Sequence, residues 1–170
     1  MIVKRAENSD AEALAKLARE TYSAAFGRSL SAADLAAHLE THLSPVSLER
    51  ILDVDTVLVA QVEGRMVGFI QFGAAAPSEG APDRDQVVRR LYVHAEFQNR
   101  GIGTLLMDTA LDHPSLGSAA RVFLDVWEHN DGARRFYERY GFRVVGERPF
   151  AVASGAETSL DLIMVRRGSG

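Results

Sequence analysis

The sequence predicts an α/β protein with a mixed sheet of about seven strands and helices on both faces. Three observations lead to this fold class. At 170 residues, the chain has the length of one domain that buries a sizeable core. Its 46% hydrophobic and 25% charged residues are ordinary for a soluble globular protein. A hairpin pattern precedes two units in which a strand is followed by a helix, and this order favours a mixed sheet.

Three helices are predicted in the first third of the chain, after a short strand at residues 2–6. Ser9 and Glu12 have the spacing of a capping box, in which a hydroxyl and a carboxylate satisfy free N–H groups at a helix start. A second helix is expected after Ser31. Ser44–Pro45 is a favourable N-cap and first position for a third, short helix.

The pattern then changes to period two. Residues 56–62 and 66–72 flank Glu63–Gly64–Arg65, and this arrangement predicts a β-hairpin. Strands are then expected at residues 86–93, 121–127, 142–147 and 159–166, and helices at residues 101–112 and 131–140. No repeat, low-complexity segment or linker divides the chain. We therefore expect one domain over residues 1–167 and a flexible tail at residues 168–170.

The composition excludes several function classes. The chain has no cysteine, which rules out disulfides, thiolate metal sites and a cysteine nucleophile. A net charge of −4 without blocks of like charge does not favour nucleic-acid binding. No apolar run approaches the roughly 20 residues that span a bilayer, and no signal peptide is recognisable. We expect a cytoplasmic protein without membrane association.

The most informative segment lies between the strand at residues 86–93 and the helix at residues 101–112. It contains Gln98-x-x-Gly101-x-Gly103. Glycine lets the backbone turn tightly and approach a ligand closely, and the N-terminus of the following helix favours an anion such as a diphosphate. The alternative is that Gly101 and Gly103 only shape a turn and bind no ligand. Leu106 stands where the dinucleotide fingerprint needs a third glycine, and the Gly-Lys-Ser/Thr of a P-loop is absent.

This segment resembles the Q/R-x-x-G-x-G/A signature of the Gcn5-related N-acetyltransferases (GNAT), whose loop N–H groups bind the diphosphate of coenzyme A. A second segment resembles the family's other signature, in which an asparagine precedes Ala-x-x-Phe-Tyr and Gly-Phe. Its residues here are Asn130, Ala133, Phe136, Tyr137, Gly141 and Phe142. Together the two segments cover roughly residues 86–147. The resemblance implies the GNAT fold, with a mostly antiparallel sheet, and an enzyme that uses acetyl-CoA.

The resemblance also implies the donor site. The residues expected to bind acetyl-CoA are Leu91, Tyr92, Val93, Gln98, Asn99, Arg100, Gly101, Ile102, Gly103, Thr104, Asn130, Ala133 and Tyr137. Arg100 either adds charge to the diphosphate site or is a solvated surface arginine. Asn130 either hydrogen-bonds the pantetheine arm, caps a helix, or does both.

The resemblance makes Tyr137 the expected general acid, and this role is chemically sensible because a phenol with a pKa of about 10 can protonate a departing thiolate of similar basicity. The alternative for Tyr137 is a packed core tyrosine. The family's reaction is a direct transfer, in which the acetyl-pantetheine arm lies between the strands at residues 86–93 and 121–127. By this resemblance, backbone groups of Leu91 and Val93 are expected to bind the arm, and an N–H near Val93 is expected to polarise the thioester carbonyl. A non-catalytic acetyl-CoA sensor is the alternative function.

The general base is not assigned by the sequence. Many family members have a glutamate on the fourth strand, where this chain has Gln86-Val-Val-Arg-Arg-Leu91. The remaining candidates near the expected site are Asp125, Glu128, His129, His94, Glu96 and a water chain.

The acceptor is expected to be a primary amine on a small molecule or a peptide. Residues 147–165 loosely resemble polyamine acetyltransferases. Specificity is expected from residues 22–45, 74–85 and 150–158. His38 and His42 have a spacing that suits a metal, but no further ligand pattern surrounds them, so no metal is expected. The chain alone gives no oligomeric state, although a homodimer would suit the fold.

Overall fold

The computed structural model describes residues 1–76, 84–151 and 157–168. Seven strands form one sheet in the order β1-β2-β3-β4-β5-β7-β6. The pairs β1–β2, β5–β7 and β6–β7 are antiparallel, whereas β4 and β5 are parallel, so the sheet is mixed. The strands are β1 (Ile2–Arg5), β2 (Thr56–Val62), β3 (Arg65–Ala74), β4 (Gln86–Val93), β5 (Arg121–Trp127), β6 (Arg143–Ala151) and β7 (Glu157–Arg167).

The helices of the described residues fall mainly where the sequence predicts them. They are α1 (Ala11–Phe26), α2 (Ala32–Leu43), α3 (Pro45–Val54), α4 (Ile102–Asp112), α5 (Pro114–Gly117) and α6 (Asp131–Arg139). The short helix α5 and the 3₁₀ turns at Asn8–Asp10 and Ala95–Phe97 are not predicted. The element order and the mixed sheet confirm the predicted fold class.

The chain forms two compact units. The first comprises Met1–Gln71 and Arg90–Leu111, and the second comprises Phe72–Arg89 and Asp112–Gly170. Strands β3 and β4 therefore contribute residues to both units. The organisation as one domain over residues 1–167 stays a prediction.

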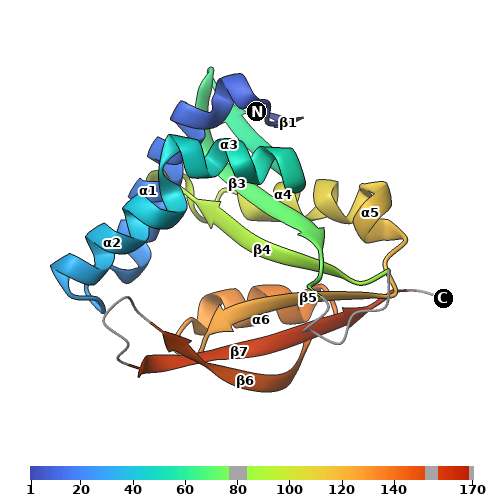
Figure 1. The fold of residues 1–170 in the computed structure, drawn as a ribbon. Coiled ribbons are helices and arrows are strands. Elements are labelled where there is room, and N and C mark those ends of the chain that lie inside the picture. The colour runs from blue at the N-terminus through green and yellow to red at the C-terminus, as the bar shows by residue number, and fades with distance from the viewer. Residues whose placement is uncertain (77–83, 152–156, 169–170) are drawn as a thin grey trace. The chain divides into compact units, whose positions relative to one another are not determined.

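The core of the first unit lies between helices α1–α3 and one face of strands β2 and β3 (Figure 1). Leu14 of α1, Leu48 of α3, and Val59 and Phe69 of the two strands are all at most 1% exposed. The opposite face of β3 contacts α4, since Gly68 lies against side chains of that helix. Neighbouring strand residues point to opposite faces, so Phe69 faces the core formed with α1–α3 whereas Gly68 faces α4.

The start of α1 differs from the prediction. The capping box is formed by Glu7 and Asp10, not by Ser9 and Glu12. The Glu7 N–H donates to Asp10 Oδ2 over 3.0 Å, and the Lys4 ammonium reaches the same oxygen at 2.9 Å. The physical reason is the 3₁₀ turn that precedes α1, because it moves the free N–H groups two residues toward the N-terminus.

The other local signals are confirmed. Ser31 Oγ accepts from the Asp34 N–H at 3.1 Å, and Ser44 Oγ accepts from the Ser47 N–H at 3.3 Å, so both serines are N-caps. The turn between β2 and β3 has φ of 51° at Glu63 and 80° at Gly64. Two successive positive φ angles are typical of the two-residue turn that joins twisted antiparallel strands.

The second unit is built around β5. Val122 and Leu124 pair with Gln86 and Val88 in the parallel β4–β5 ladder. On its other side, β5 pairs with β7 along its whole length, and β6 follows β7 with a register shift between Val144 and Gly146. Figure 1 shows α6 beside the β5–β7 layer.

Two predicted segments lie partly outside the described residues. Residues 77–83 of the predicted loop at 74–85 and residues 152–156 of the turn at 150–158 belong to these parts, as do residues 169–170 of the predicted tail. The Gly168 N–H donates to the Ala120 carbonyl over 2.9 Å.

Replacing Gly68 by alanine should destabilise the first unit. A Cβ there would meet the Tyr92 carbonyl oxygen at 3.0 Å, and Ile102 and Leu106 side-chain carbons at 3.2 Å. Overpacking of this kind costs about 1–3 kcal/mol. Urea denaturation measures the loss in the free energy of unfolding.

Gly132→Ala is the matched control for this prediction. Its Cβ would meet only the Asn130 Oδ1, at 3.8 Å. If Gly68→Ala lowers the free energy of unfolding no more than Gly132→Ala does, the packing of α4 on β3 does not require a glycine at position 68.

Candidate functional site

The predicted diphosphate loop lies in the first unit, where the chain passes from β4 to α4. Asn99 and Gly101 have φ of 58° and 79°, so both adopt the left-handed conformation. A Cβ on Gly101 would meet nothing within 4 Å, and the glycine is therefore favoured by its backbone angle rather than by space. The Leu105 N–H donates to the Gly101 carbonyl over 2.9 Å, and this bond opens α4.

The loop is suited to an anion by position and by charge. Residues 98–101 are exposed, whereas Ile102 is 2% exposed and fixes the first turn of α4 in the core. The first N–H groups of a helix have no partner within the helix, and together with the helix dipole they attract an anion. Arg100 lies here too, with its guanidinium carbon 5.4 Å from the centre of the Phe97 ring.

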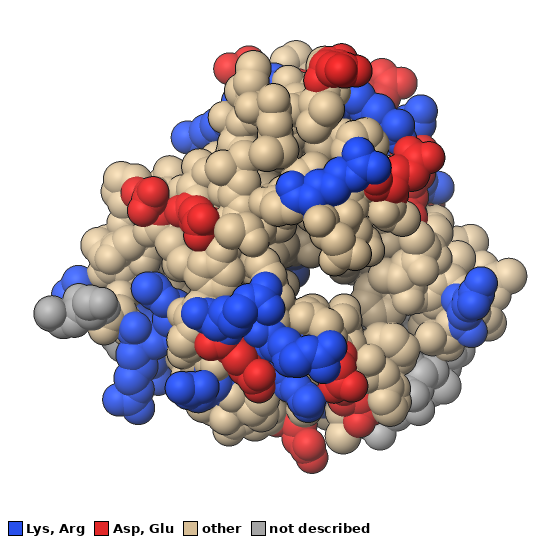
Figure 2. Space-filling view, turned by 180° about the vertical axis from the view of Figure 1, so that it is seen from behind, with Lys and Arg blue, Asp and Glu red and all other residues tan. Residues whose placement is uncertain are grey.

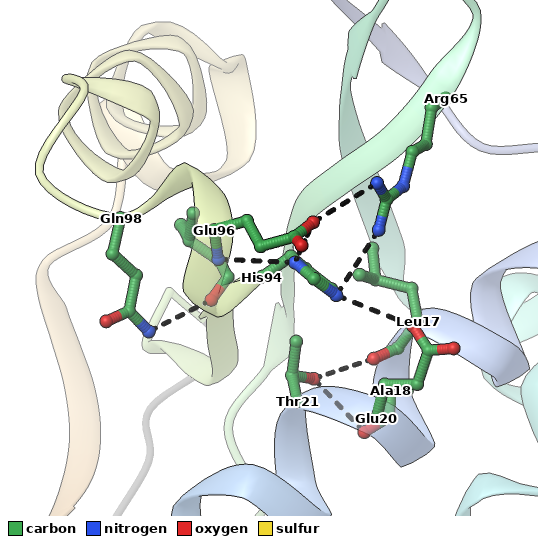
Figure 3. Close-up of polar contacts among 9 residues, drawn as sticks. Leu17, Ala18, Glu20, Thr21, Arg65, His94, Glu96 and Gln98 are labelled. Carbon is green, nitrogen blue, oxygen red and sulfur yellow. Dashed lines mark hydrogen bonds and ion pairs between the residues drawn. The ribbon is translucent and has the colours of Figure 1, made fainter.

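Gln98 holds the loop to the end of β4. Its Nε2 donates to the Val93 carbonyl oxygen over 3.1 Å (Figure 3). The side chain predicted to contact the cofactor is therefore used within the protein. Of the other predicted residues on this strand, Tyr92 packs its ring against Phe69 with a centroid distance of 5.7 Å. Leu91 and Val93 are half-buried beside it.

The second predicted segment lies in the second unit. Asn130 caps α6, because its Oδ1 accepts from the Ala133 N–H over 3.1 Å. Tyr137 is 8% exposed. Its ring packs edge-on against the rings of Phe136 and Phe142, with centroid distances of 5.4 and 5.9 Å. The capping role of Asn130 and the packed position of Tyr137 are therefore present. Their roles toward a ligand stay predictions.

The candidate bases of the second unit are engaged in contacts of their own. Asp125 forms an ion pair with Arg148. The Glu128 carboxylate accepts from the Leu160 N–H over 2.8 Å. The His129 side chain is two-thirds exposed, and its Nε2 lies 3.7 Å from Glu128 Oε1.

Asp161 is a titratable residue that the sequence does not single out. Strand pairing sets it opposite Trp127 on one side and Arg148 on the other. Burial raises the pKa of the Asp161 carboxyl, and the charge of Asp125 raises it further, while Arg148 opposes both. No local pattern in the sequence signals this neighbourhood, because strand pairing alone creates it.

The stretch Gln86–Leu91 of the fourth strand has no carboxylate, and the structure gives its Arg90 a partner. Its Nη1 donates to Gln71 Oε1 over 2.6 Å, and Gln71 Nε2 donates to Asp55 Oδ2 over 2.6 Å. Gln71 is 2% exposed and Asp55 is 8% exposed. The buried amide therefore connects a guanidinium with a carboxylate of opposite charge, and such a chain satisfies its polar atoms.

His38 and His42 lie in a cluster of aromatic rings with Tyr22. The Tyr22 and His38 rings stack with their centroids 4.1 Å apart and their planes 7° from parallel, and the His38 and His42 ring centroids are 4.7 Å apart. Burial lowers the pKa of His38 to about 4, and the charges of His42 and Arg90 contribute to the shift. Among the described residues, no group of three His, Cys, Asp or Glu side chains could hold a metal ion.

The first unit also has an open cavity of about 430 Å³ between α1 and the β2–β3 hairpin. Lys16, Glu20 and Arg65 are among its charged lining residues, and Leu17 and Met66 are among the apolar ones. Glu20 and Arg65 also approach His94, which follows β4. The sequence does not predict this cluster, because its members are far apart along the chain.

The surface charge is mixed. Figure 2 shows Lys and Arg side chains beside Asp and Glu side chains, rather than one uniformly basic face. Within residues 1–76, 84–151 and 157–168, no helix has the length and apolar character needed to cross a membrane.

Comparison with known proteins identifies the class of protein. Residues 11–142 match the model of the acetyltransferase (GNAT) family. An uncharacterized N-acetyltransferase of Mycobacterium tuberculosis is 30% identical over 160 residues, which cover 93% of this chain and 97% of the relative. A spermine/spermidine N(1)-acetyltransferase of Bacillus subtilis is 29% identical over 90 residues, which cover 52% of this chain and 59% of the relative.

The structural comparison gives the same fold. The PaiA N-acetyltransferase of Thermoplasma acidophilum, solved in complex with coenzyme A, superposes with a TM-score of 0.78 at 20% identity. The match covers 98% of this chain and 99% of that structure. The chain belongs to the GNAT family of acetyltransferases. It is an acetyl-CoA-dependent enzyme that transfers an acetyl group to an amine, which confirms the resemblance predicted from its two motifs.

The buried His38 should make stability depend on pH. Its pKa is about 4 in the folded chain and about 6.5 in an unfolded one, so only the unfolded chain binds the proton between these values. The His38 contribution to stability is complete above pH 6.5 and is lost as the pH falls toward 4. With solvent screening of a half-buried ring, we expect a loss of about 1–2 kcal/mol.

The measurement is urea denaturation of the wild type and His38→Phe from pH 7 to pH 4.5. The carboxylates of the protein affect both chains alike, so the difference between the two curves reports on His38. The wild type should lose more stability than the variant over this range. Parallel curves would show that His38 titrates normally.

Proposed function

We propose that the loop at Gln98–Thr104, whose residues 98–101 are exposed, binds the diphosphate of acetyl-CoA, and that the acetyl group passes to a primary amine. The main support is the backbone of Asn99 and Gly101, whose left-handed conformations bring an exposed turn to the N-terminus of α4 in a GNAT chain. Helix N–H groups, the helix dipole and Arg100 then act on the same anion.

The remaining donor contacts follow from the family signature. Backbone groups of Leu91 and Val93 would bind the pantetheine arm as an added strand, and the N-terminal part of α6 would contribute through Asn130 and Ala133. Because Asn130 Oδ1 already accepts from Ala133, its Nδ2 is the atom that we assign to the arm. Tyr92 and Gln98 would support the site by packing and by holding the loop, rather than by direct contact.

The chemistry that we propose is a direct transfer. The neutral amine nitrogen attacks the thioester carbonyl carbon, and an N–H near Val93 stabilises the negative charge on the carbonyl oxygen. The C–S bond then breaks, and Tyr137 gives its phenolic proton to the sulfur. We assign removal of the amine proton to water, because Asp125 is paired with Arg148 and Glu128 accepts a backbone N–H.

The acceptor class that we propose to test first is a polyamine. The support is the similarity to the Bacillus subtilis spermine/spermidine enzyme, together with the acidic balance of the chain. Amino acids, aminoglycosides and peptide N-termini form the rest of the panel. The absence of cysteine suits a reducing compartment, and we propose the cytoplasm as the site of action.

Gly101→Ala should weaken acetyl-CoA binding, as measured by calorimetry. Alanine disfavours the φ of 79° by about 1–2 kcal/mol, so the turn would relax and displace the N–H groups of the loop. We expect Kd to rise by about tenfold or more. Gly141→Ala is the matched control, with φ of 84° and open space around its Cβ, and should leave Kd unchanged. Absence of any binding by the wild type would disprove the donor assignment.

Tyr137→Phe should lower kcat by at least about tenfold while the Kd for coenzyme A changes little. The variant keeps the buried ring and removes only the proton donor, and general acids contribute about 10²–10⁴-fold. Thiol release with a panel of amines measures the rate. Tyr140→Phe, at the end of the same helix, is the control. An unchanged rate for Tyr137→Phe would remove Tyr137 from the mechanism, and binding without turnover on any amine would favour a sensor.

A further inference from the structure

We infer that His94, together with Glu20, Arg65 and Glu96, holds the diphosphate loop in position, and that His94 is a positioning residue for cofactor binding. We call these four residues the His94 clamp. The inference rests on the proposed function, since it assigns a support to the same loop. Figure 3 shows the four side chains pointing toward one another from α1, from the start of β3 and from the turn after β4.

The polar contacts of the clamp connect three segments. His94 Nε2 lies 3.3 Å from Arg65 Nη2 and 3.8 Å from Glu20 Oε2. The other ring nitrogen, Nδ1, accepts from the Glu96 N–H at 3.4 Å. Arg65 Nη1 donates to Glu96 Oε2 over 3.3 Å, which closes a ring of contacts around the imidazole.

The backbone fixes His94 at the same point. Its N–H donates to the Val67 carbonyl of β3 over 2.8 Å, and its own carbonyl accepts from the Phe97 N–H over 2.8 Å. The second bond closes the 3₁₀ turn that leads into Gln98. The direction in which the chain leaves β4 is therefore set at His94, four residues before the diphosphate loop begins.

An aromatic contact links the clamp to the loop itself. The Phe97 ring has the guanidinium of Arg65 and that of Arg100 each 5.4 Å from its centre. The His94 ring meets Phe97 edge-on at 6.2 Å. Cations are attracted to aromatic faces at this distance. The clamp thus contacts the same ring that holds Arg100, the charged residue of the loop.

Charge pairing gives the clamp a second effect. Glu96 is exposed and lies two residues before Gln98, where its negative charge would oppose an approaching diphosphate. Arg65 pairs with this carboxylate and offsets its charge. The side chains of Arg65 and Glu96 are 53% and 68% exposed, and exposed pairs contribute little to global stability. Their effect should therefore show in cofactor affinity and not in unfolding.

The test is the binding of coenzyme A to His94→Leu and His94→Asn. Leucine has a similar volume but no nitrogen, whereas the asparagine amide oxygen can accept from the N–H two residues on, as Nδ1 does here. We expect about a five- to tenfold rise in Kd and in the KM for acetyl-CoA for His94→Leu, with partial rescue by asparagine. The kcat at saturation, the KM for the amine and the melting temperature should change little.

Arg65→Met tests the second half of the clamp. It should weaken binding more than Arg5→Met, which removes the same charge from the exposed strand β1 and controls for the general attraction of an anion. The double variant of Arg65 and His94 should lose less affinity than the sum of the two single losses, because both act on one loop.

The outcomes separate this inference from the proposed function. A His94→Leu protein that binds coenzyme A like the wild type, while Gly101→Ala does not, overturns the clamp and leaves the donor site intact. Equal losses of affinity, kcat and melting temperature in His94→Leu also overturn it, because they indicate a general structural role. No effect of Gly101→Ala would instead refute the donor site itself.

Discussion

The first unit depends on the close contact between α4 and β3 at Gly68. Without a side chain there, the Ile102 and Leu106 side chains come so close to the strand that an added Cβ would lie 3.2 Å from each. The chain must travel from the end of β4 to this point in eight residues. A 3₁₀ turn and the left-handed residues Asn99 and Gly101 make this path possible. The N–H groups of the predicted diphosphate loop are therefore positioned by packing that lies beneath them.

The interior of the first unit also explains the unusual fourth strand. Arg90 lies in the stretch of β4 that has no carboxylate, and it is bound to the Gln71–Asp55 pair. A carboxylate at that position would face Asp55 across a buried amide and would lack a counter-charge. The same guanidinium contributes to the neutral state of His38. One arginine in a strand thus both satisfies a buried amide and influences the protonation of a histidine on a neighbouring helix.

Much of the fold was predictable because its signals are local. The hairpin turn and the N-caps Ser31 and Ser44 depend on a few adjacent residues and are confirmed, although β3 begins at Arg65, one residue earlier than predicted. The capping box was misplaced by two residues, since the 3₁₀ turn before α1 has no sequence signal of its own. The His94 clamp and the neighbourhood of Asp161 arise from residues far apart in the chain. The ligand roles of Asn130, Tyr137 and the loop residues remain predictions that rest on the resemblance to the two GNAT signatures.

The two-residue hairpin turn at Glu63–Gly64 has a consequence for how this chain can vary. Arg65 is the first residue after the turn, and its side chain lies on the same side of the strand as Phe69 of the core because the register of β3 is fixed. One residue inserted directly after Arg65 would place the guanidinium on the opposite side from Phe69 and carry it away from Phe97. Surface hairpins usually tolerate changes in length, but here a length polymorphism would act as an affinity mutation at a distance from the ligand.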